Sequence, residues 1–367
     1  MVPIADSDTQ FLGFKWRDHI YKDCALPMGC ASSSAIFQCI SDALVWIVQA
    51  KFGAGKIIVL DDFLFVGESQ QSCEDSLRGF EYMCQQLCIP LHPEKTVRPC
   101  QSLTFLGVEI DLPVNEMRLP HEKVEKARAA VSSLLLRKKA ALREVQACNG
   151  LLHFACLAVP LGRPFLRRMF NLCRGVRRPY HRVSITKEAR LDLQEWLTFL
   201  SNFNGRSLLE RRRWLSDAGL LLETDAAGSV GLGAICGSRW LAGVCPSWLC
   251  DADIGVKELI AVVVPVHIWS DVLACRCVTV RSDNSGVVTA LNSQSSRSAA
   301  AMVWLRHLFR VTVKHDILLR AVHIPGVNNA APDALSRGSI QVFRSLRPTA
   351  DTCATRWDWS DFAMLRQ

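Results

Sequence analysis

The C-terminal part of the chain alternates apolar runs with turns in a way that predicts strands. In LLETDAAGSVGLGAIC, residues 221 to 236, an apolar run ends in an acid, small residues follow, and a second apolar run contains two glycines. This pattern predicts a strand, a tight turn and a paired strand. In CRCVTVRSD, residues 275 to 283, Val278 and Val280 alternate with polar residues, which predicts another strand that ends at Asp283. Asn284 then opens the next segment as a cap.

Two further segments of this region predict helices beside those strands. IGVKELIAVVVPVHIW, residues 254 to 269, has apolar residues at roughly helical spacing, although Pro265 interrupts it. We expect Glu258 in the first turn of this helix, facing the sheet. In LLRAVHIPGVNNAAPDALSRG, residues 318 to 338, an apolar strand runs into a Pro-Gly turn and then into a short helix with Asp333 near its start. The predicted fold class is α/β (α+β).

The acids of these four segments, Asp225, Glu258, Asp283 and Asp333, predict one metal site. Strand ends and the first turns of flanking helices meet at one edge of an α/β sheet, so the carboxylates can converge there. Divalent cations such as Mg²⁺ offset the repulsion between like charges, and two ions roughly 4 Å apart would activate a water for phosphodiester hydrolysis. His323, on the turn before Asp333, would move a proton or assist product release. Any one of these acids alone is more often a solvated loop residue.

The N-terminal third carries a second acidic signal. KIIVLDDFLFVG, residues 56 to 67, predicts a β-hairpin whose turn brings Asp61 and Asp62 into a cleft, the alternative being a solvated turn. Upstream, LPMGCASSSAIFQ, residues 26 to 38, predicts a turn leading into a helix. Downstream, Lys95 lies in a predicted loop before the strand-like FLGVEI at 105 to 110.

Between these regions the chain predicts basic helices. HEKVEKARAAVSSLLLRKKAALREVQACNGLLHFA, residues 121 to 155, has apolar residues at helical spacing, with a stop predicted at Asn149-Gly150. A cationic cluster with interleaved aromatic residues follows. Its arginines are Arg163, Arg167, Arg168, Arg174, Arg177, Arg178, Arg182, Arg211, Arg212 and Arg213. Such a run is either a solvated face or a surface that contacts phosphates without regard to sequence.

Composition agrees with a globular protein that binds an acidic partner. The 367 residues are 49% hydrophobic and 21% charged, with a formal net charge of +8, which favours nucleic acid. The 16 cysteines include no CxxC pair, which argues against zinc and for reduced thiols in a cytoplasmic or nuclear protein. The longest apolar stretch, around 259 to 269, is too short to span a membrane, and no secretory signal is evident.

Residues 217 to 340 resemble the ribonuclease H domain of retroelement polyproteins. The resemblance covers the four acidic positions, and His323 and Asn329 match the family's late His and Asn. It implies cleavage of the RNA strand of an RNA-DNA hybrid with two Mg²⁺ or Mn²⁺ ions on the four acids, and nucleic-acid contacts from Asn284 and Asn329. Pro332 stands where the family often has Ala, which a first helical turn tolerates.

The N-terminal segments resemble motifs B to E of a reverse transcriptase palm and the start of its thumb. LGFKW and LPMGC look like the DIRS-type (tyrosine-recombinase) retrotransposon branch. The resemblance makes Asp61 a metal ligand with Asp62 beside it, with Val59 in place of the usual Tyr. The family's first catalytic Asp and its fingers are expected upstream of VPIADSD, so we expect that this chain does not copy RNA on its own.

The resulting expectation is a retroelement polyprotein fragment with four parts. They are a truncated palm at 1–115, a basic helical thumb and connection at 116–216, a ribonuclease H-like domain at 217–340, and a tail at 341–367 that reads as a linker. The expected partners are an RNA-DNA hybrid and a template-primer, contacted by Lys95, Arg167, Arg168, Arg177 and Arg178. Two alternatives stay open: a polymerase completed by missing upstream sequence, and a non-catalytic nucleic-acid-binding relic.

Overall fold

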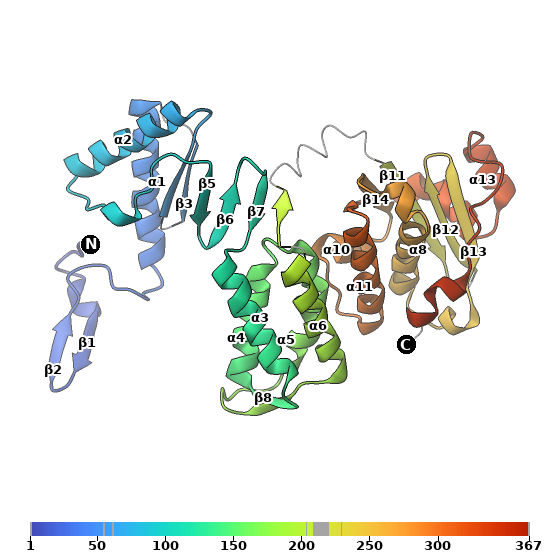
Figure 1. The fold of residues 1–367 in the computed structure, drawn as a ribbon, viewed down its shortest axis with the longest axis horizontal. Helices are drawn as coiled ribbons and strands as arrows, with labels where there is room; N and C mark the ends of the chain where they lie inside the picture. The colour runs from blue at the N-terminus through green and yellow to red at the C-terminus, as the bar shows by residue number, and fades with distance from the viewer. Residues whose placement is uncertain are drawn as a thin grey trace. The chain divides into compact units, whose positions relative to one another are not determined.

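The computed structural model describes residues 2–53, 56–60, 62–202, 204–207, 220–228 and 230–365. It is a mixed α/β structure, which confirms the predicted fold class. The chain divides into two compact units, Met1–Pro113 and Val114–Gln367 (Figure 1). The four acids that the sequence singles out in its C-terminal half all belong to the second unit.

The first unit consists of hairpins and two helices around a small core. Its elements are β1 (Gly13–Trp16), β2 (His19–Lys22), α1 (Ser33–Phe52), β3 (Lys56–Leu60), β4 (Asp62–Val66), α2 (Gln70–Gln86), β5 (Ser102–Phe105) and β6 (Val108–Asp111), with the short 3₁₀ helices η1 (Thr9–Phe11) and η2 (Pro93–Lys95). β3 and β4 form the hairpin that the apolar-acid-apolar pattern predicts, with Leu60 opposite Asp62. Leu44 and Val48 of α1 pack with Phe80 of α2 in the core.

The segment FLGVEI is a hairpin turn with flanking strand residues, which corrects the prediction of one strand. β5 ends at Phe105, and Val108 begins β6 directly opposite it. The turn residues Leu106 and Gly107 both have positive φ, 48° and 75°. A two-residue turn with both φ values positive matches the twist of the paired strands, and the glycine is what permits it.

Helix α1 is the one helix in the described residues that is long and apolar enough to cross a membrane. The sequence had placed the longest apolar stretch at 259 to 269 instead. Only 17% of the most apolar window of α1 is buried within the structure. The core helix of a soluble protein and a signal sequence meet the same criteria of length and composition.

The second unit begins with a helical subdomain, residues 114–207. Its elements are β7 (Glu116–Arg118), α3 (His121–Leu135), β8 (Lys139–Ala141), α4 (Leu142–Ala155), η3 (Pro160–Phe165), α5 (Arg167–Leu172), β9 (Arg182–Ser184), α6 (Lys187–Asn202) and β10 (Arg206–Ser207). Helices α3 to α6 enclose a continuous core in which Trp196 is fully buried.

The predicted helix stop at Asn149-Gly150 is wrong, because α4 runs through both residues to Ala155. Asn149 is buried, and its side-chain Nδ2 donates to the backbone oxygen of Met169 at 3.2 Å. A glycine inside a helix costs about 1 kcal/mol relative to alanine. Burial of the α4 face that contains Val145 and Leu152 outweighs that cost.

A sheet subdomain, residues 220–365, completes the second unit. Its elements are β11 (Leu220–Ala227), β12 (Gly231–Cys236), β13 (Arg239–Val244), η4 (Ser247–Leu249), α8 (Ile254–Ile268), α9 (Ser270–Leu273), β14 (Cys277–Ser282), α10 (Ser285–Ser293), α11 (Ala299–Lys314), β15 (Leu318–His323), η5 (Gly326–Asn329), α12 (Ala330–Ser336), α13 (Ile340–Leu346) and η6 (Trp359–Leu365). The strand order is β13-β12-β11-β14-β15. β11 pairs antiparallel with β12 and parallel with β14, which in turn pairs parallel with β15.

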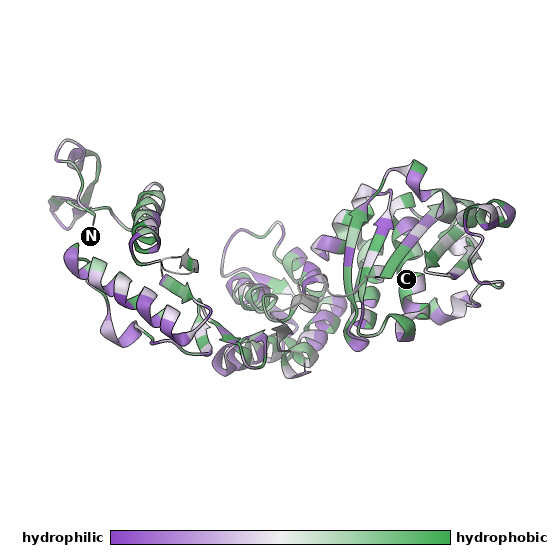
Figure 2. Cartoon of the chain, turned by 90° about the horizontal axis from the view of Figure 1, so that it is seen from above, coloured by the Kyte–Doolittle hydropathy of each residue, from purple (hydrophilic) through white to green (hydrophobic). Residues whose placement is uncertain are grey.

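Helices cover both faces of this sheet. α8 and α11 pack on one face in the main core, while α12 and α13 pack on the other around Ile235 and Phe343. In Figure 2 the strands near the C-terminus are largely hydrophobic in colour, as expected for a sheet that is buried on both sides. α8 continues through Pro265 to Ile268, so the proline does not end it.

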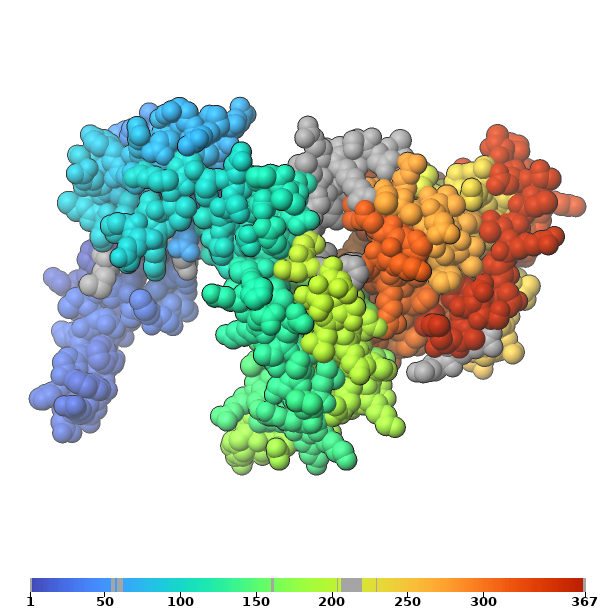
Figure 3. All heavy atoms as spheres, in the orientation of Figure 1, coloured from blue at the N-terminus to red at the C-terminus, as the bar shows by residue number. Residues whose placement is uncertain are grey.

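The segment after Arg337 packs on the sheet subdomain, which corrects the expectation of a linker. Phe343 and Phe362 are fully buried. The indole N–H groups of Trp357 and Trp359 donate to backbone oxygens of β13, at 3.1 and 3.0 Å. Figure 3 shows these C-terminal residues, in red, lying against the yellow and orange parts of the subdomain. The C-terminal segment is therefore part of this fold.

A buried ion pair joins the two subdomains of the second unit. Asp192 on α6 is 1% exposed and accepts hydrogen bonds from Arg168 at 2.9 Å and from Arg306 of α11 at 3.3 Å. Burial, the largest cause, raises the pKa of Asp192 to about 6 and lowers the pKa of Arg306 to about 10. Each buried charge is tolerated because the opposite charge faces it.

We predict that Asp192→Asn destabilises the second unit by about 3 kcal/mol, because Arg306 stays buried without a counter-charge. Urea unfolding followed by tryptophan fluorescence measures the change. The matched control is Glu195→Gln on the same helix, which removes a more exposed partner of Arg310 and should cost less than about 1 kcal/mol. Equal losses in the two variants would contradict the role given to burial.

A buried histidine pair supports the C-terminal segment. The Nε2 atom of His307 lies 3.1 Å from Nδ1 of His267, and both rings contact the ring of Phe362. Burial, the largest cause, lowers the pKa of His307 from 6.5 to about 4. Both rings therefore pack uncharged at neutral pH.

We predict that acid weakens this region through His307. Since the folded-state pKa lies below the ordinary value, the unfolded chain takes up the proton first, and stability declines as the pH falls from about 6.5 toward 4. The free energy of unfolding should drop by about 2 kcal/mol between pH 7 and pH 5 through this group. Denaturant unfolding at both pH values should show a smaller drop in His307→Asn. An unchanged pH dependence in that variant would contradict the assignment.

Candidate metal centre

Asp225 lies within β11 and is held from the opposite helix. Its carboxylate is 6% exposed and accepts a short hydrogen bond from the Oγ of Ser336 at the end of α12. The Nδ2 atom of Asn329 donates to the backbone oxygen of Thr224 at 3.0 Å, just before Asp225. These contacts fix the strand and the carboxylate together. Desolvation by burial, the largest cause, raises the pKa of Asp225, and the charges of Asp283 and Asp333 raise it further.

A glycine opposite Asp225 allows α12 to come this close. Gly233 of β12 pairs with Asp225 in the sheet register. A Cβ atom at Gly233 would lie 2.4 Å from Cβ of Leu335 and 2.7 Å from the backbone oxygen of Pro332. Any other residue at this position would push α12 away from the sheet and take Ser336 away from Asp225.

Glu258 approaches the same point from α8 on the other face of the sheet. Asp253 caps this helix by accepting from the backbone N–H of Gly255 at 2.8 Å, so Glu258 is the fifth residue of α8 and lies beyond the first turn that the sequence predicted. Its carboxylate is 7% exposed and accepts a hydrogen bond from the backbone of Ala226. The Oε2 atom is buried and has no hydrogen-bond partner among the described residues.

Asp283 follows directly after β14, as the alternating pattern predicts. Asn284 caps α10 by accepting from the backbone N–H groups of Gly286 and Val287, at 2.9 and 3.2 Å. His323 is the last residue of β15, a strand position where the sequence had predicted a turn. Its Nε2 atom lies 3.0 Å from the backbone oxygen of Asp283. The imidazole is thus anchored beside the acid and is exposed on its other side.

Three of the four predicted acids converge. Asp225, Glu258 and Asp283 each place one carboxylate oxygen so that the three oxygens lie within 4.8 Å of one another. Asp333 is in the first turn of α12, as predicted, but it is outside this trio and accepts a 2.8 Å hydrogen bond from Nε of Arg337. The charge of Asp333 still contributes to the raised pKa values of Asp225 and Glu258.

The chemistry of the trio fits a divalent cation. Carboxylate oxygens are the ligand type that Mg²⁺ and Mn²⁺ prefer. Asp225 and Glu258 supply buried ones, and Asp283 a half-buried one. Desolvation, the largest cause, raises the pKa of Glu258 to about 8, and the charges of Asp225 and Asp283 add to it. A buried carboxylate oxygen without a partner, surrounded by like charge, is satisfied when a cation binds.

The remaining predicted residues divide by exposure. Asn329 is 1% exposed, and the side chain of Arg168, 28% exposed, is paired with Asp192. Their assignment as nucleic-acid contacts stays a prediction. Lys95, in η2, is exposed. Arg177 and Arg178 are also exposed, and Arg167 is half-buried at the start of α5. Asp62 is exposed at the start of β4, whereas Asp61 and the arginines at 211 to 213 lie outside the described residues.

Sequence reasoning missed the residues that hold the acids in place. Ser336 and the backbone of Ala226 each bind one carboxylate of the trio. Asn329, which the sequence singles out for a different role, holds the strand. Ser336 lies three residues after Asp333, on the same short helix, so its spacing within PDALSR was a usable signal. The bond from Ala226 depends on tertiary placement and has no signal in the sequence.

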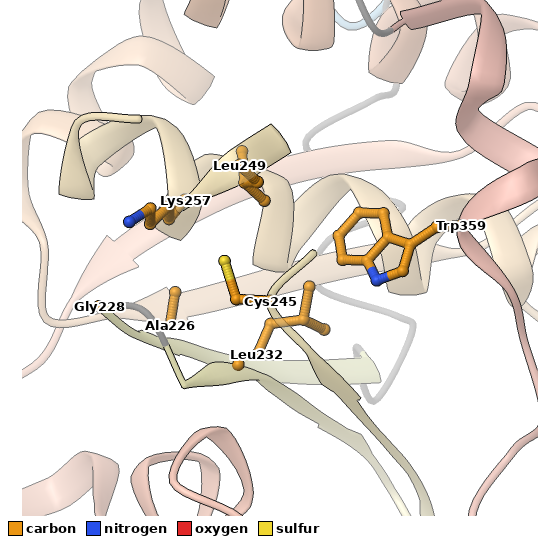
Figure 4. A pocket seen from close by; sticks show the side chains of 8 residues that line it. Ala226, Gly228, Leu232, Cys245, Leu249, Lys257 and Trp359 are labelled. Carbon is orange, nitrogen blue, oxygen red and sulfur yellow. The ribbon is translucent and has the colours of Figure 1, made fainter. Parts of the chain in front are cut away.

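A small pocket beside the trio holds no carboxylate. Figure 4 shows that it is lined by residues of β11, β12 and α8 together with Trp359, and that Cys245 faces it. Its volume accommodates roughly one water molecule. Lys257, at its edge, donates from Nζ to the backbone oxygen of Cys250 at 2.6 Å. This pocket is too small for a nucleotide. The candidate site for a reaction is therefore the acidic edge of the sheet.

Most of the first unit is similar to a known family. Residues 4–110 match the reverse transcriptase (RNA-dependent DNA polymerase) family. That match covers the β3-β4 hairpin and ends before the acidic trio. A comparison with curated proteins finds no match.

Three of the solved structures that are similar to the chain are of foamy viral proteins. A foamy viral protease-reverse transcriptase dRH in complex with double-stranded DNA matches 88% of this chain and 54% of its own, with 15% identity and a TM-score of 0.48. The protease-reverse transcriptase with an RNA/DNA hybrid matches 87% and 42%, with 15% identity and a TM-score of 0.46. The same protein with double-stranded DNA matches 88% and 65%, with 17% identity and a TM-score of 0.46. The chain thus spans about half the length of these proteins.

We predict that Glu258→Gln stabilises the metal-free protein. The pKa of Glu258 is raised from 4.5 to about 8, so stability from this group is present below pH 4.5 and is lost as the pH rises toward 8. In EDTA at pH 8 the variant should be more stable than the wild type by about 3 kcal/mol. Adding Mn²⁺ should raise the melting temperature of the wild type and leave that of the variant nearly unchanged. A destabilised variant in EDTA would argue against a strained acidic centre.

Proposed function

We propose that the sheet subdomain is a metal-dependent ribonuclease H that hydrolyses the RNA strand of RNA-DNA hybrids. The observation that carries the proposal is the convergence of Asp225, Glu258 and Asp283 at one sheet edge. These acids come from a strand, from a helix on one face of the sheet and from the end of the neighbouring parallel strand. Charged carboxylates at this place do not contribute to apolar packing. Their mutual repulsion is compatible with a folded protein when divalent cations are bound.

The residues of the site have separate tasks in this proposal. Asp225, Glu258 and Asp283 would hold the cation, and Asp333 would join them after releasing Arg337 or would hold a second ion with them. Bound divalent cations would supply a water of lowered pKa and stabilise the charge that develops on the phosphodiester. His323, anchored through Asp283 and exposed on its other side, would carry a proton to or from the leaving oxygen.

The first unit supports a retroelement origin for the whole chain. Its family match points to a reverse transcriptase palm, and we propose that the chain derives from a retroelement polyprotein of the DIRS type. The matched foamy viral proteins bind double-stranded DNA or an RNA/DNA hybrid, according to their descriptions. A net charge of +8 and the exposed Arg177 and Arg178 suit the same kind of partner. The alternative is a polymerase that upstream sequence completes, in which case this chain alone should not extend a primer.

We predict metal-dependent cutting of a labelled RNA-DNA hybrid by the purified chain. Cleavage of the RNA strand should require Mg²⁺ or Mn²⁺ and stop in EDTA. Asp283→Asn should reduce the rate by a factor on the order of 1,000, because loss of a metal ligand removes several kcal/mol of transition-state stabilisation. Asp333→Asn should cost less, since Asp333 lies outside the trio.

The matched control for these acids is Asp271→Asn, whose side chain is 95% exposed in the same subdomain. It should cut at the wild-type rate. Binding of the hybrid without any metal-dependent cutting by the wild type would reject the nuclease proposal and favour a non-catalytic nucleic-acid-binding protein. Cutting that survives in Asp283→Asn would mean that a contaminating nuclease or another site is responsible.

A further inference from the structure

A second charged cluster lies directly behind the acidic trio. Glu223 precedes Asp225 by two residues on β11, and Arg281 precedes Asp283 by two residues on β14. The parallel register places Glu223 opposite Arg281. Because side chains two residues apart in a strand share a face, Glu223 lies on the same side as Asp225, and Arg281 on the same side as Asp283.

The third member of the cluster comes from the C-terminal segment. Arg347 follows α13 and donates from Nη2 to Oε2 of Glu223 in a short hydrogen bond. Nη1 of Arg281 lies 3.7 Å from Oε1 of the same carboxylate. Glu223 is 7% exposed, so its carboxylate is largely removed from water and each oxygen faces a different arginine.

Arg347 is held in place by its own packing. Its backbone N–H donates to the backbone oxygen of Phe343 at 2.9 Å, and Phe343 is fully buried against the sheet. The guanidinium therefore reaches Glu223 from a fixed point on the fold. The side chains of Arg347 and Arg281 are 42% and 41% exposed, whereas Glu223 is buried. Removing Arg347 would therefore leave a buried carboxylate with the more distant Arg281 as its remaining partner of opposite charge.

The position of this cluster bears on the metal centre. Without the two arginines, the Glu223 charge would add to the negative charge of the trio one strand step away. With them, the ion pairs of Glu223 connect β11 to β14 at the last paired position of the two strands. Asp225 and Asp283 each follow two residues later. A cation that is shared between Asp225 and Asp283 requires the two carboxylates to stay at a fixed distance from each other.

We propose that Arg347, Glu223 and Arg281 form a positioning triad, through which the C-terminal segment sets the affinity of the acidic trio for a divalent cation. The inference rests on the proposed function only in taking the trio as a cation site. None of the three residues is a ligand or contacts the reacting atoms. Groups that orient ligands in this way typically change metal affinity by about 10- to 100-fold when removed.

The test is calorimetric titration of Mn²⁺ into the full chain without nucleic acid. Arg347→Met keeps the aliphatic stem and removes the charge, and it should weaken Mn²⁺ binding by about tenfold. Arg347→Lys should restore part of the affinity. In hybrid cleavage, Arg347→Met should need about tenfold more Mn²⁺ for half-maximal rate, with kcat at saturating Mn²⁺ and KM for the hybrid nearly unchanged.

Arg344→Met is the matched control, because Arg344 lies in the last turn of α13, three residues before Arg347, and its contacts are structural. It packs over the ring of Trp240 and donates to the backbone oxygens of Ala350 and Thr352. It should lower the melting temperature without changing Mn²⁺ affinity. Glu223→Gln provides a second variant should Arg347→Met fail to fold, and it should also weaken Mn²⁺ binding.

Unchanged Mn²⁺ affinity in folded Arg347→Met and Glu223→Gln would overturn the triad. Equal effects of Arg344→Met and Arg347→Met on affinity would do the same, since they would reduce the role to general stability. Failure of the proposed nuclease is separate: wild-type protein would bind Mn²⁺, and the variants would bind it more weakly, while no hybrid is cut.

Discussion

Electrostatic repulsion among three carboxylates, two of them buried and the third half-buried, is the constraint around which the sheet subdomain is built. Asp225, Glu258 and Asp283 bring oxygens within 4.8 Å of one another in a place largely shielded from water. Burial and like charge both disfavour ionisation there, and the pKa of Glu258 rises to about 8. A fold that keeps such an arrangement loses stability unless a cation is bound, so the surrounding structure has to hold the acids firmly.

The fold meets this requirement from both faces of the sheet. α8 brings Glu258 from one face, and α12 brings Ser336 to Asp225 from the other, which Gly233 permits by leaving space for the helix. The C-terminal segment then packs α13 against the sheet. Three hydrogen bonds from indole N–H groups, those of Trp240, Trp357 and Trp359, join this segment to β13. Rigidity at the acidic edge therefore depends on residues far along the chain, including a segment that shows no periodic pattern.

Local pattern predicted the strands and the acids that end them, and it failed where distant residues decide the structure. Val278 and Val280 alternate clearly, so β14 and Asp283 were predictable. The Asn149-Gly150 pair looked like a helix end because propensity is local, whereas burial of α4 in the subdomain core overrides it. Asp333 lies outside the trio because that position depends on how α12 packs on the sheet, which spacing alone does not reveal. Its i,i+4 ion pair with Arg337 is by contrast a local feature of the helix. The burial of Asn329 likewise follows from tertiary packing.

The most direct test of this account is the position of a bound cation. Crystals of the chain soaked in Mn²⁺ would be measured at the manganese absorption edge, and the anomalous difference map locates the ion independently of any activity. The account predicts a peak within about 2.2 Å of oxygens from Asp225, Glu258 and Asp283. No peak at the trio at millimolar Mn²⁺, or a peak bound only by other residues, would contradict the central claim that these acids form a metal centre.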